Sequence, residues 1–296
     1  MSAVRRETTT LAYQEPAAAE AGREFAFSDA DFRELVQIAY QRAGIALSDN
    51  KRDLVYSRVS RRLRALDMTS FREYREALNA GDDTELERFI NAISTNHTKF
   101  FREAHHLSHF KDHVAAAFAK SQGGGRGRLR VWSAGCSSGE EPYSIALILR
   151  QEIPDTARHD IRILATDIDT DILRKASRGD YPVTSLDEIP DRYRKLFQSK
   201  GDEEAERVVV DDKVRSLITF RRLNLIETWP VKGPFDAIFC RNVMIYFDQK
   251  TRTRLIERFT SLIRPRGWLY IGHSESLIGA HPGLSLVGRT IYRREP

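Results

Sequence analysis

The residues best suited to chemistry lie in a loop that follows a short apolar stretch. Residues 131–144 read Val-Trp-Ser-Ala-Gly-Cys-Ser-Ser-Gly-Glu-Glu-Pro-Tyr-Ser, which predicts a strand, a loop with two glycines and the start of a helix. Such a loop lets the backbone approach a ligand at the carboxyl end of a strand. Phosphate-binding loops usually read G-x-G-x-x-G. Here Gly135 and Gly139 are four apart and Glu140 and Glu141 would repel phosphate, so a neutral or cationic adenosine ligand fits better than ATP or NAD.

An acidic residue, Asp167, ends the next predicted strand. A carboxylate at the tip of the second strand of an α/β sheet can accept hydrogen bonds from both ribose hydroxyls of an adenosine. Together with the loop, it indicates S-adenosylmethionine, whose sulfonium is positively charged. For these two features alone, the alternative is a helix-capping Asp beside a tight structural turn.

Two patterns imitate metal sites. Asp167, Asp169 and Asp171 resemble the start of a calcium-binding loop, but Ile172 replaces the required Gly and Arg178 replaces the bidentate Glu. A second pattern consists of three histidines on one stripe of a predicted helix, of which the first and the last are eight positions apart. Residues at that spacing are about 12 Å apart, too far for one ion. We therefore predict no metal site; the histidines of this stripe are His105, His109 and His113.

Two further patterns could supply a nucleophile. The sequence Gly272-His-Ser-Glu-Ser276 follows a predicted strand and nearly matches the G-x-S-x-G nucleophile elbow, but Ser276 replaces the second Gly. A hydrolase is therefore the second enzyme class to consider. Cys136 and Cys240 are also candidates, although buried thiols more often have a structural role.

The composition limits these interpretations. The chain has 296 residues, of which 41% are hydrophobic and 30% charged, with 47 basic and 42 acidic side chains and a formal net charge of +5. It can form about two domains with real cores, which excludes disordered and fibrous classes. No run approaches the roughly 18 apolar residues of a membrane span, and residues 1–22 lack the apolar region of a signal peptide. Two cysteines cannot form a disulfide framework, so we expect a cytoplasmic protein.

Helical periodicity dominates the N-terminal part. Ser28 is a good N-cap with Asp31 at the capping-box distance, and Gly44 predicts the end of this first helix. Apolar residues at helical spacing predict a second helix at about 49–66, a short third one and a fourth that ends before Asn96. These features predict a small all-helical domain.

From about residue 128, strands and helices alternate, which predicts a mostly parallel sheet with helices on both faces. The expected strands are 129–133, 161–166, 218–222, 236–241 and 268–272, and the expected helices are 140–151, 170–177 and 251–263. One stretch fits poorly because it is rich in Pro and charge and contains one short strand, Val208–Val210. The predicted organisation is a flexible tail at 1–25, a helical domain at 26–97 and an α/β domain at 98–296, with an insertion at 178–216.

Several motifs resemble those of the chemotaxis receptor methyltransferases of the CheR type. They are Asn96-His-Thr98-Lys-Phe-Phe-Arg102, the 133–144 loop, Ala165-Thr-Asp167-Ile-Asp, Phe235-Asp-Ala-Ile-Phe-Cys-Arg241-Asn242-Val-Met-Ile-Tyr246-Phe and Gly272-His-Ser-Glu275. The match spans about Ser28 to Tyr292, and together the motifs are highly specific.

This resemblance implies an all-helical N-terminal domain, a Rossmann-like methyltransferase domain that depends on S-adenosylmethionine, and a small inserted β subdomain. The implied reaction transfers a methyl group to glutamate side chains on cytoplasmic helices of methyl-accepting chemoreceptors, with S-adenosylhomocysteine as the product. Carried over by motif, the cofactor contacts are Asn96, Thr98, Arg102, Glu141, Asp167, Asn224, Leu225, Arg241 and Asn242.

The implied chemistry suggests roles for two further side chains. A glutamate carboxylate is ionised at neutral pH, so no general base is needed and catalysis is mainly the positioning of two reactants. Arg102 and Tyr246 are the candidates to orient the incoming carboxylate, Arg as a bidentate donor and Tyr through its hydroxyl. The alternatives are an ion pair of Arg102 near Glu103 or with the cofactor carboxylate, and a structural role for Tyr246.

The predicted helix at 49–66 is strongly basic. Between Lys51 and Leu66 there are six basic residues and one acidic residue, which equals the net charge of the whole chain. We predict that this helix docks the acidic substrate helices of the receptor. The alternatives are a solvated face and a nucleic-acid surface. The residues assigned to docking are Arg58, Arg61, Arg62 and Arg64.

Two other functions remain to be distinguished. One is a non-enzymatic sensor that keeps the cofactor pocket, which the presence of Arg102, Asp167 and Tyr246 disfavours. The other is a nucleic-acid methyltransferase, which commonly carries an acidic/Asn-Pro-Pro-aromatic tetrad where this chain has Arg241-Asn-Val-Met. We expect no nucleic-acid partner, no membrane insertion and, by default, a monomer. Whether the inserted subdomain binds a C-terminal tether peptide of the receptor is left open.

Overall fold

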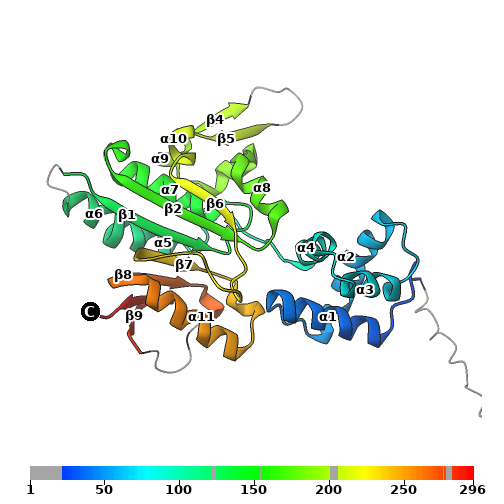
Figure 1. Ribbon diagram of the computed structural model, residues 1–296. Helices are drawn as coiled ribbons and strands as arrows, with labels where there is room; N and C mark the ends of the chain where they lie inside the picture. The colour runs from blue at the N-terminus through cyan, green and yellow to red at the C-terminus, as the bar shows by residue number, and fades with distance from the viewer. Residues whose placement is uncertain (1–21, 122–124, 154, 201–205, 276, 278–281) are drawn as a thin grey trace, which may run out of the picture.

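The computed structural model describes residues 22–121, 125–153, 155–200, 206–275, 277 and 282–296. In Figure 1 a helical unit lies beside a larger unit that is built on a twisted sheet, and a small second sheet lies on the edge of that larger unit. The tail predicted at 1–25 falls mostly outside the described residues. Among the described helices, none has the length and apolar character needed to cross a bilayer.

The first helix of the helical unit begins and ends where the sequence predicts. Helix α1 spans Asp29–Ala43; the Ser28 hydroxyl accepts the Asp31 N–H, the Asp31 carboxylate accepts the Ser28 N–H, and Gly44 ends the helix with φ +72°. A core of fully buried side chains from all four α-helices, including Leu35 and Phe89, holds the unit together. The following helices are η1 (Asp49–Lys51), α2 (Arg52–Ala65), α3 (Phe71–Asn79) and α4 (Asp83–Ile93).

The large sheet has seven strands in the order β6-β2-β1-β7-β8-β10-β9. The first five pair in parallel, and β10 pairs antiparallel with β8 and β9. The strands are β1 (Arg128–Ala134), β2 (Asp160–Asp167), β6 (Ile218–Arg222), β7 (Phe235–Cys240), β8 (Ile263–Ile271), β9 (Leu284–Gly288) and β10 (Ile291–Arg294). All five predicted strands are present. The last hairpin was not predicted; its edge strand β9 carries apolar side chains, Leu286 and Val287, that are exposed.

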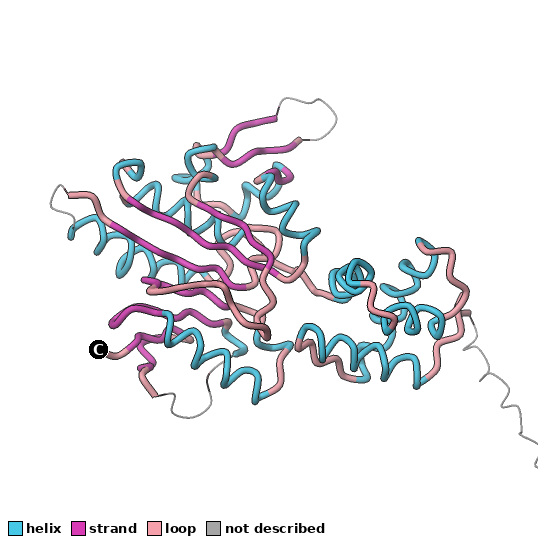
Figure 2. Tube along the Cα trace, viewed as in Figure 1, coloured by secondary structure: helices cyan, strands magenta, loops and turns pink. Residues whose placement is uncertain are grey.

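Helices cover both faces of this sheet, as Figure 2 shows. Alternate residues of a strand point to opposite faces. Val131 and Phe239 accordingly join the core under α5, α6 and α7, whereas Trp132 and Ile238 join the core under α11. The helices of this unit are α5 (Ala104–Phe110), the π-helical turn η2 (Lys111–Ala115), α6 (Ala116–Ser121), α7 (Glu140–Glu152), η3 (Thr156–Arg158), α8 (Thr170–Arg178), η5 (Met244–Tyr246), α11 (Gln249–Leu262) and η6 (His273–Glu275).

The second sheet is antiparallel, has the order β3-β5-β4, and lies in the stretch that the sequence marks as an insertion. Strand β5 contains the strand predicted at Val208–Val210. The elements of this stretch are β3 (Asp180–Pro182), η4 (Val183–Glu188), α9 (Asp191–Arg194), β4 (Phe197–Lys200), β5 (Arg207–Val210) and α10 (Asp212–Arg215).

The strand order reverses between β1 and β7, because the chain adds β2 and β6 on one side of β1 and then β7 and β8 on the other. Open α/β sheets bind ligands at such a switch point, outside the carboxyl ends of the strands. The helical unit is tied to this end of the sheet. The Asn224 side chain donates to the Arg42 carbonyl (2.7 Å), and the Ala46 N–H donates to the Tyr246 carbonyl (2.8 Å).

Candidate active site

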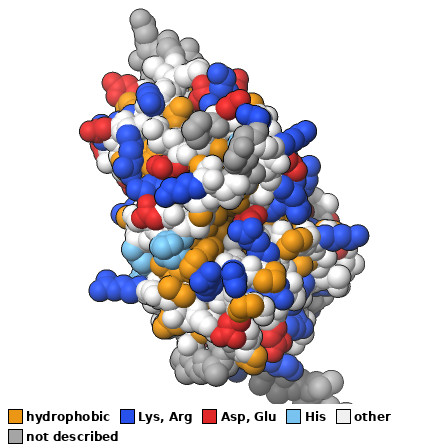
Figure 3. Space-filling model, turned by 90° about the vertical axis from the view of Figure 1, so that its left-hand side faces the viewer, with side chains coloured by type: hydrophobic (Ala, Val, Ile, Leu, Met, Phe, Trp, Pro, Cys, Tyr) orange, Lys and Arg blue, Asp and Glu red, His pale blue; other side chains and the backbone are white. Residues whose placement is uncertain are grey.

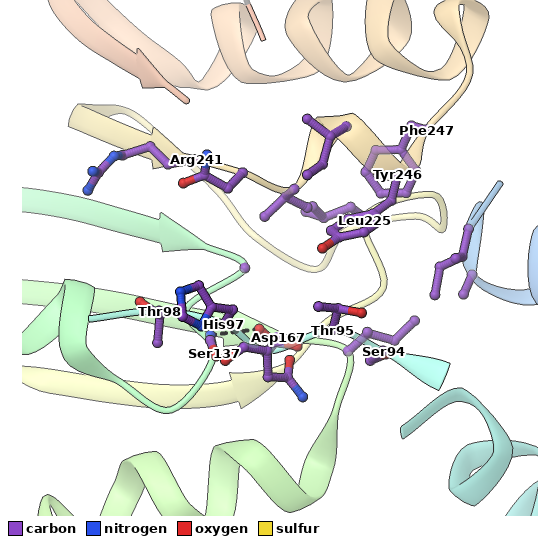
Figure 4. A pocket seen from close by; sticks show the side chains of 18 of the residues that line it. Ser94, Thr95, His97, Thr98, Ser137, Asp167, Leu225, Arg241, Tyr246 and Phe247 are labelled. Atoms are coloured by element: carbon purple, nitrogen blue, oxygen red, sulfur yellow. Dashed lines mark hydrogen bonds between the residues drawn. The ribbon is translucent and has the colours of Figure 1, made fainter. Parts of the chain in front are cut away.

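A cavity of about 490 Å³ lies at the carboxyl ends of β1, β2, β6 and β7, and residues of the helical unit form its remaining walls. This volume is in the usual range for small-molecule sites. Figure 4 shows Asp167 and Ser137 on one wall, with Leu225 and Tyr246 on the facing wall. The nine residues assigned to cofactor binding from the sequence all line the cavity, as does Tyr246. The structure therefore brings them together, and their individual roles stay predictions.

The glycine-containing loop after β1 is fixed against the tip of β2. Gly135 and Cys136 both donate their N–H to the Thr166 carbonyl, at 2.7 and 2.9 Å. Gly135 has φ +84°, and a Cβ at this position would lie 2.2 Å from a methyl carbon of Val243. Only glycine allows the loop and the segment after β7 to approach this closely, and this approach forms one end of the cavity.

Asp167 is buried at the end of β2 with its carboxylate partly satisfied. One oxygen accepts the Ser137 N–H (2.8 Å) and the other the Asp169 N–H (3.1 Å), which leaves acceptor capacity toward the cavity. The capping role considered for Asp167 belongs to Asp169, whose side chain accepts the N–H groups of Asp171 and Ile172 at the start of α8. Asp167 is thus available to a ligand.

Arg241 lies in a buried ion-pair cluster beside the cavity. Its guanidinium donates to Glu141 (3.0 Å), to Glu103 (3.3 Å) and to the carbonyl of Arg102. Burial raises the pKa of Glu141. Burial also acts to raise the pKa of Glu103, but hydrogen bonds and charges from His106, Arg241 and His273 outweigh it and hold that pKa well below its usual range. Two carboxylates share one guanidinium, and of the two, Glu141 lies on the cavity wall, where it can meet a positively charged group of a ligand.

Glu103 was not assigned a role from the sequence. The only sequence signal was its place beside Arg102, because its partner Arg241 is 138 residues away and is brought near by the sheet order. Arg102 itself donates to the His97 carbonyl (2.9 Å), and within the described residues it pairs with no carboxylate. The ion pair near Glu103 that the sequence suggested for Arg102 is instead made by Arg241.

Asn224 contributes to the cavity and to the junction between the two units. Its side-chain amide donates both hydrogens, to the Arg42 carbonyl and to Glu227 (2.8 Å), and its oxygen accepts the Ile226 N–H. Both side-chain hydrogens are therefore used within the protein. Leu225 follows on the cavity wall and is buried.

The arginines assigned to docking differ in their surroundings. Arg58 donates to the Ile93 and Ser94 carbonyls at the end of α4, at 2.8 and 2.7 Å. Arg62 forms a bidentate pair with buried Glu85 (2.9 and 2.6 Å), and Arg64 pairs with an exposed acid, Glu24. Among the described residues, Arg61 is exposed without an acidic partner.

Basic charge is also found far from α2. Figure 3 views the face that lies opposite the helical unit, and Lys and Arg side chains are scattered over it. The sequence count places a net +5 in the segment 51–66, but internal ion pairs partly neutralise that helix.

Several of the residues that imitate metal or nucleophile sites in the sequence are packed or buried in the structure. His109 and His113 stack at a centroid distance of 4.2 Å, and burial lowers the pKa of His109 to about 4. Within the described ranges, no three His, Cys, Asp or Glu side chains are placed to hold one metal ion. Cys136 and Cys240 are buried, and burial raises both thiol pKa values well above their usual value. Ser276 lies outside the described residues.

These residues fit S-adenosylmethionine by their chemistry. Asp167 has the free acceptor capacity that two ribose hydroxyls need, and the Glu141 carboxylate on the cavity wall suits an ammonium or sulfonium group of the ligand. Leu225 is an apolar side chain on the cavity wall, against which a base would pack. When bound, S-adenosylmethionine supplies an activated methyl group.

Protonation of Asp167 should make the affinity for the cofactor depend on pH. Burial raises its pKa to about 6, so the carboxylate is ionised above that pH and protonated below it. Because only the ionised form accepts from both ribose hydroxyls, affinity for S-adenosylhomocysteine should fall about tenfold per pH unit below pH 6. Calorimetric titration between pH 5 and 8 measures this. The Asp167→Asn variant should bind weakly with no such dependence, and an equally steep slope in that variant would assign the titration to another group.

Comparison with known proteins places the chain among methyltransferases. Residues 96–292 match the family model described as CheR methyltransferase, SAM binding domain, and residues 30–94 match CheR methyltransferase, all-alpha domain. The chain is 44% identical over 257 residues to a probable chemotaxis protein methyltransferase of Rhizobium etli, covering 86% of this chain and 96% of the relative. It is 43% identical over 270 residues to the chemotaxis protein methyltransferase of Escherichia coli, covering 90% and 91% of the two chains.

Proposed function

We propose that this chain, which belongs to the CheR methyltransferase family and uses S-adenosylmethionine, methylates glutamate side chains on the cytoplasmic helices of methyl-accepting chemoreceptors. The observation that supports this most is the position of Arg102 on the cavity wall. Within the described residues its guanidinium has no carboxylate partner, so it is free to receive one from a substrate. The relatives named above are chemotaxis protein methyltransferases, which agrees with a receptor substrate.

The proposed reaction asks little of acid–base groups. The glutamate oxygen forms a bond to the methyl carbon, the carbon–sulfur bond breaks with its electron pair on sulfur, and the products are a methyl ester and S-adenosylhomocysteine. No proton moves, because glutamate is ionised at neutral pH. Arg102 and Tyr246 have only to hold the carboxylate in line, without binding it so tightly that the ground state is stabilised.

The test is methyl transfer from radiolabelled S-adenosylmethionine to receptor-containing membranes. We expect label in the receptor that mild base releases as methanol, because esters hydrolyse in base and N-methyl groups do not. Base-stable label, or no label above that of membranes lacking receptors, would contradict the proposal. A parallel assay with receptors that lack their C-terminal tails shows whether the inserted subdomain, 178–216, uses a tether peptide.

Receptor docking is best tested at Arg61. Its exposed charge should attract acidic receptor helices, so Arg61→Glu should raise the KM for receptor about threefold to tenfold at low salt and less at high salt. The kcat and the affinity for S-adenosylhomocysteine should not change. Arg72→Glu, on the exposed face of α3, is the matched control. An equal effect of both reversals would show that net charge alone matters, not this surface.

Reversal of Arg62 is a poorer test, because it would leave buried Glu85 without its bidentate partner. Among the described side chains, only the Tyr74 hydroxyl and the more distant Arg88 would then remain as partners of Glu85. We propose the helical unit, 26–97, as the substrate-docking domain and 98–296 as the methyltransferase domain, acting as a cytoplasmic monomer. The negative charge of the substrate glutamates before methylation and the basic character of α2 support this division.

A further inference from the structure

The turn Gly272–Glu275, which the sequence suggested as a nucleophile elbow, holds the loop that carries Tyr246. Glu275 is buried, and both of its carboxylate oxygens point at backbone groups. One oxygen accepts the N–H of Gly272 (2.8 Å) and of Asn242 (2.7 Å), and the other accepts the N–H of Ile245 (3.0 Å). The turn after β8 is thereby joined to both ends of the loop that follows β7.

Within the part of the chain that the structure describes, Glu275 forms no ion pair with a cation. Hydrogen bonds from backbone N–H groups oppose the burial that raises its pKa. A buried carboxylate without a cation costs folding free energy, and Gln has nearly the same volume at no such cost. Only a carboxylate, however, accepts on both oxygens at once, since the amide of Gln would turn an NH₂ group toward one of the N–H donors. The three hydrogen bonds to the turn and the loop therefore explain why a carboxylate, and not an amide, stands at position 275.

The loop needs such an anchor because its backbone is strained. Asn242 has φ +59°, a left-handed conformation that costs free energy for a residue other than glycine. The turn lies very close to it: a Cβ on Gly272 would lie 2.5 Å from a Glu275 oxygen and 2.8 Å from the Asn242 nitrogen. The bond from Asn242 to Glu275 therefore fixes the strained residue, and the bond from Ile245 fixes the residue next to Tyr246.

We propose that Glu275 is a positioning residue for methyl transfer: it holds the loop 242–246 so that the Tyr246 hydroxyl meets the incoming carboxylate. This inference rests on the proposed function, because it takes the role of Tyr246 from it. Glu275 contacts neither cofactor nor substrate in this proposal and acts only through the loop. Its effect should therefore depend on the presence of the Tyr246 hydroxyl.

The test is a double-mutant cycle with Glu275→Gln and Tyr246→Phe, using receptor membranes and measuring kcat together with affinity for S-adenosylhomocysteine. We expect Glu275→Gln to lower kcat tenfold to a hundredfold in the native background and less than twofold in the Tyr246→Phe background. Because the same loop carries Asn242, a predicted cofactor contact, any loss of affinity for S-adenosylhomocysteine should be equal in the two backgrounds. Asp82→Asn is the matched control, since this N-cap carboxylate accepts the N–H groups of Thr84 and Glu85 far from the cavity. It should leave kcat within twofold of the native value.

The outcomes separate the two proposals. Equal losses of kcat in both backgrounds, no loss of kcat at all, or a Glu275→Gln variant that no longer binds S-adenosylhomocysteine would overturn the positioning role and leave the receptor-methylation proposal standing. If the unaltered enzyme yields no base-labile label on receptors, the proposed function fails before the cycle is measured.

Discussion

Replacement of Asp167 by Ala should abolish cofactor binding and leave the fold intact. Two ribose hydroxyls would lose a charged acceptor, and hydrogen bonds to charged groups contribute about 1.5–3 kcal/mol each. Affinity for S-adenosylhomocysteine should therefore fall at least about 100-fold, measured by calorimetric titration. The fold should survive because two effects offset each other. The N–H groups of Ser137 and Asp169 lose their acceptor. In compensation, the variant lacks a buried carboxylate whose pKa burial raises to about 6, and whose ionised form opposes folding above that pH.

Asp171→Ala is the matched control for this experiment. Asp171 lies four residues further along on α8, is exposed, and pairs only with Arg174 among the described residues. It should leave the affinity unchanged. The melting temperature of Asp167→Ala should stay within about 5 °C of the native value. Unchanged affinity in Asp167→Ala would mean that the adenosine does not lie against the tip of β2.

Replacement of Arg102 by Ala should have the largest effect on the reaction itself. If this guanidinium orients the substrate carboxylate, its loss should lower the rate at saturating substrates about 100-fold or more, because misplacement by 1 Å already costs about that much. Arg102→Lys should recover little, since an ammonium cannot make the paired N–H bonds of a guanidinium. Single-turnover methyl transfer to receptor membranes measures both variants.

The affinity for S-adenosylhomocysteine distinguishes the two roles assigned to Arg102. A loss of rate at full cofactor affinity means that Arg102 acts on the substrate carboxylate. A parallel loss of affinity means that it binds the carboxylate of the cofactor. Arg174→Ala removes an exposed arginine and should change neither quantity, because exposed ion pairs contribute little.

Those parts of the fold that depend on local signals could be predicted from the sequence. Ser28, Asp31 and Gly44 set both ends of α1 through bonds within a few residues. The strands of the parallel sheet followed from apolar runs. The β9–β10 hairpin was missed: β9 is apolar in sequence, but it is an edge strand whose Leu286 and Val287 side chains are exposed and join no core.

The sequence identified residues of the site, but it did not identify the hydrogen bonds and ion pairs that these residues form. Motifs identified ten of the residues that line the cavity, but the partner of each side chain depends on sheet order and on the packing of the helical unit. Arg62 illustrates this limit: its place on a basic face suggested docking, whereas Glu85 on another helix binds its guanidinium. Glu275 illustrates it again, since its three backbone partners could be identified only from the folded chain.

The cavity walls come from both units, and this limits how the protein can be re-engineered. Residues 43, 45–48 and 93–97 of the helical unit form part of the same enclosure as Asp167 and Arg241. The two units are therefore not interchangeable modules. A chimera that takes the helical unit of a relative, to redirect the enzyme to other receptors, must also match the surfaces that meet Asn224 and Tyr246. A poorly matched graft would lose cofactor affinity along with substrate choice, even with every residue of the sheet unit unchanged.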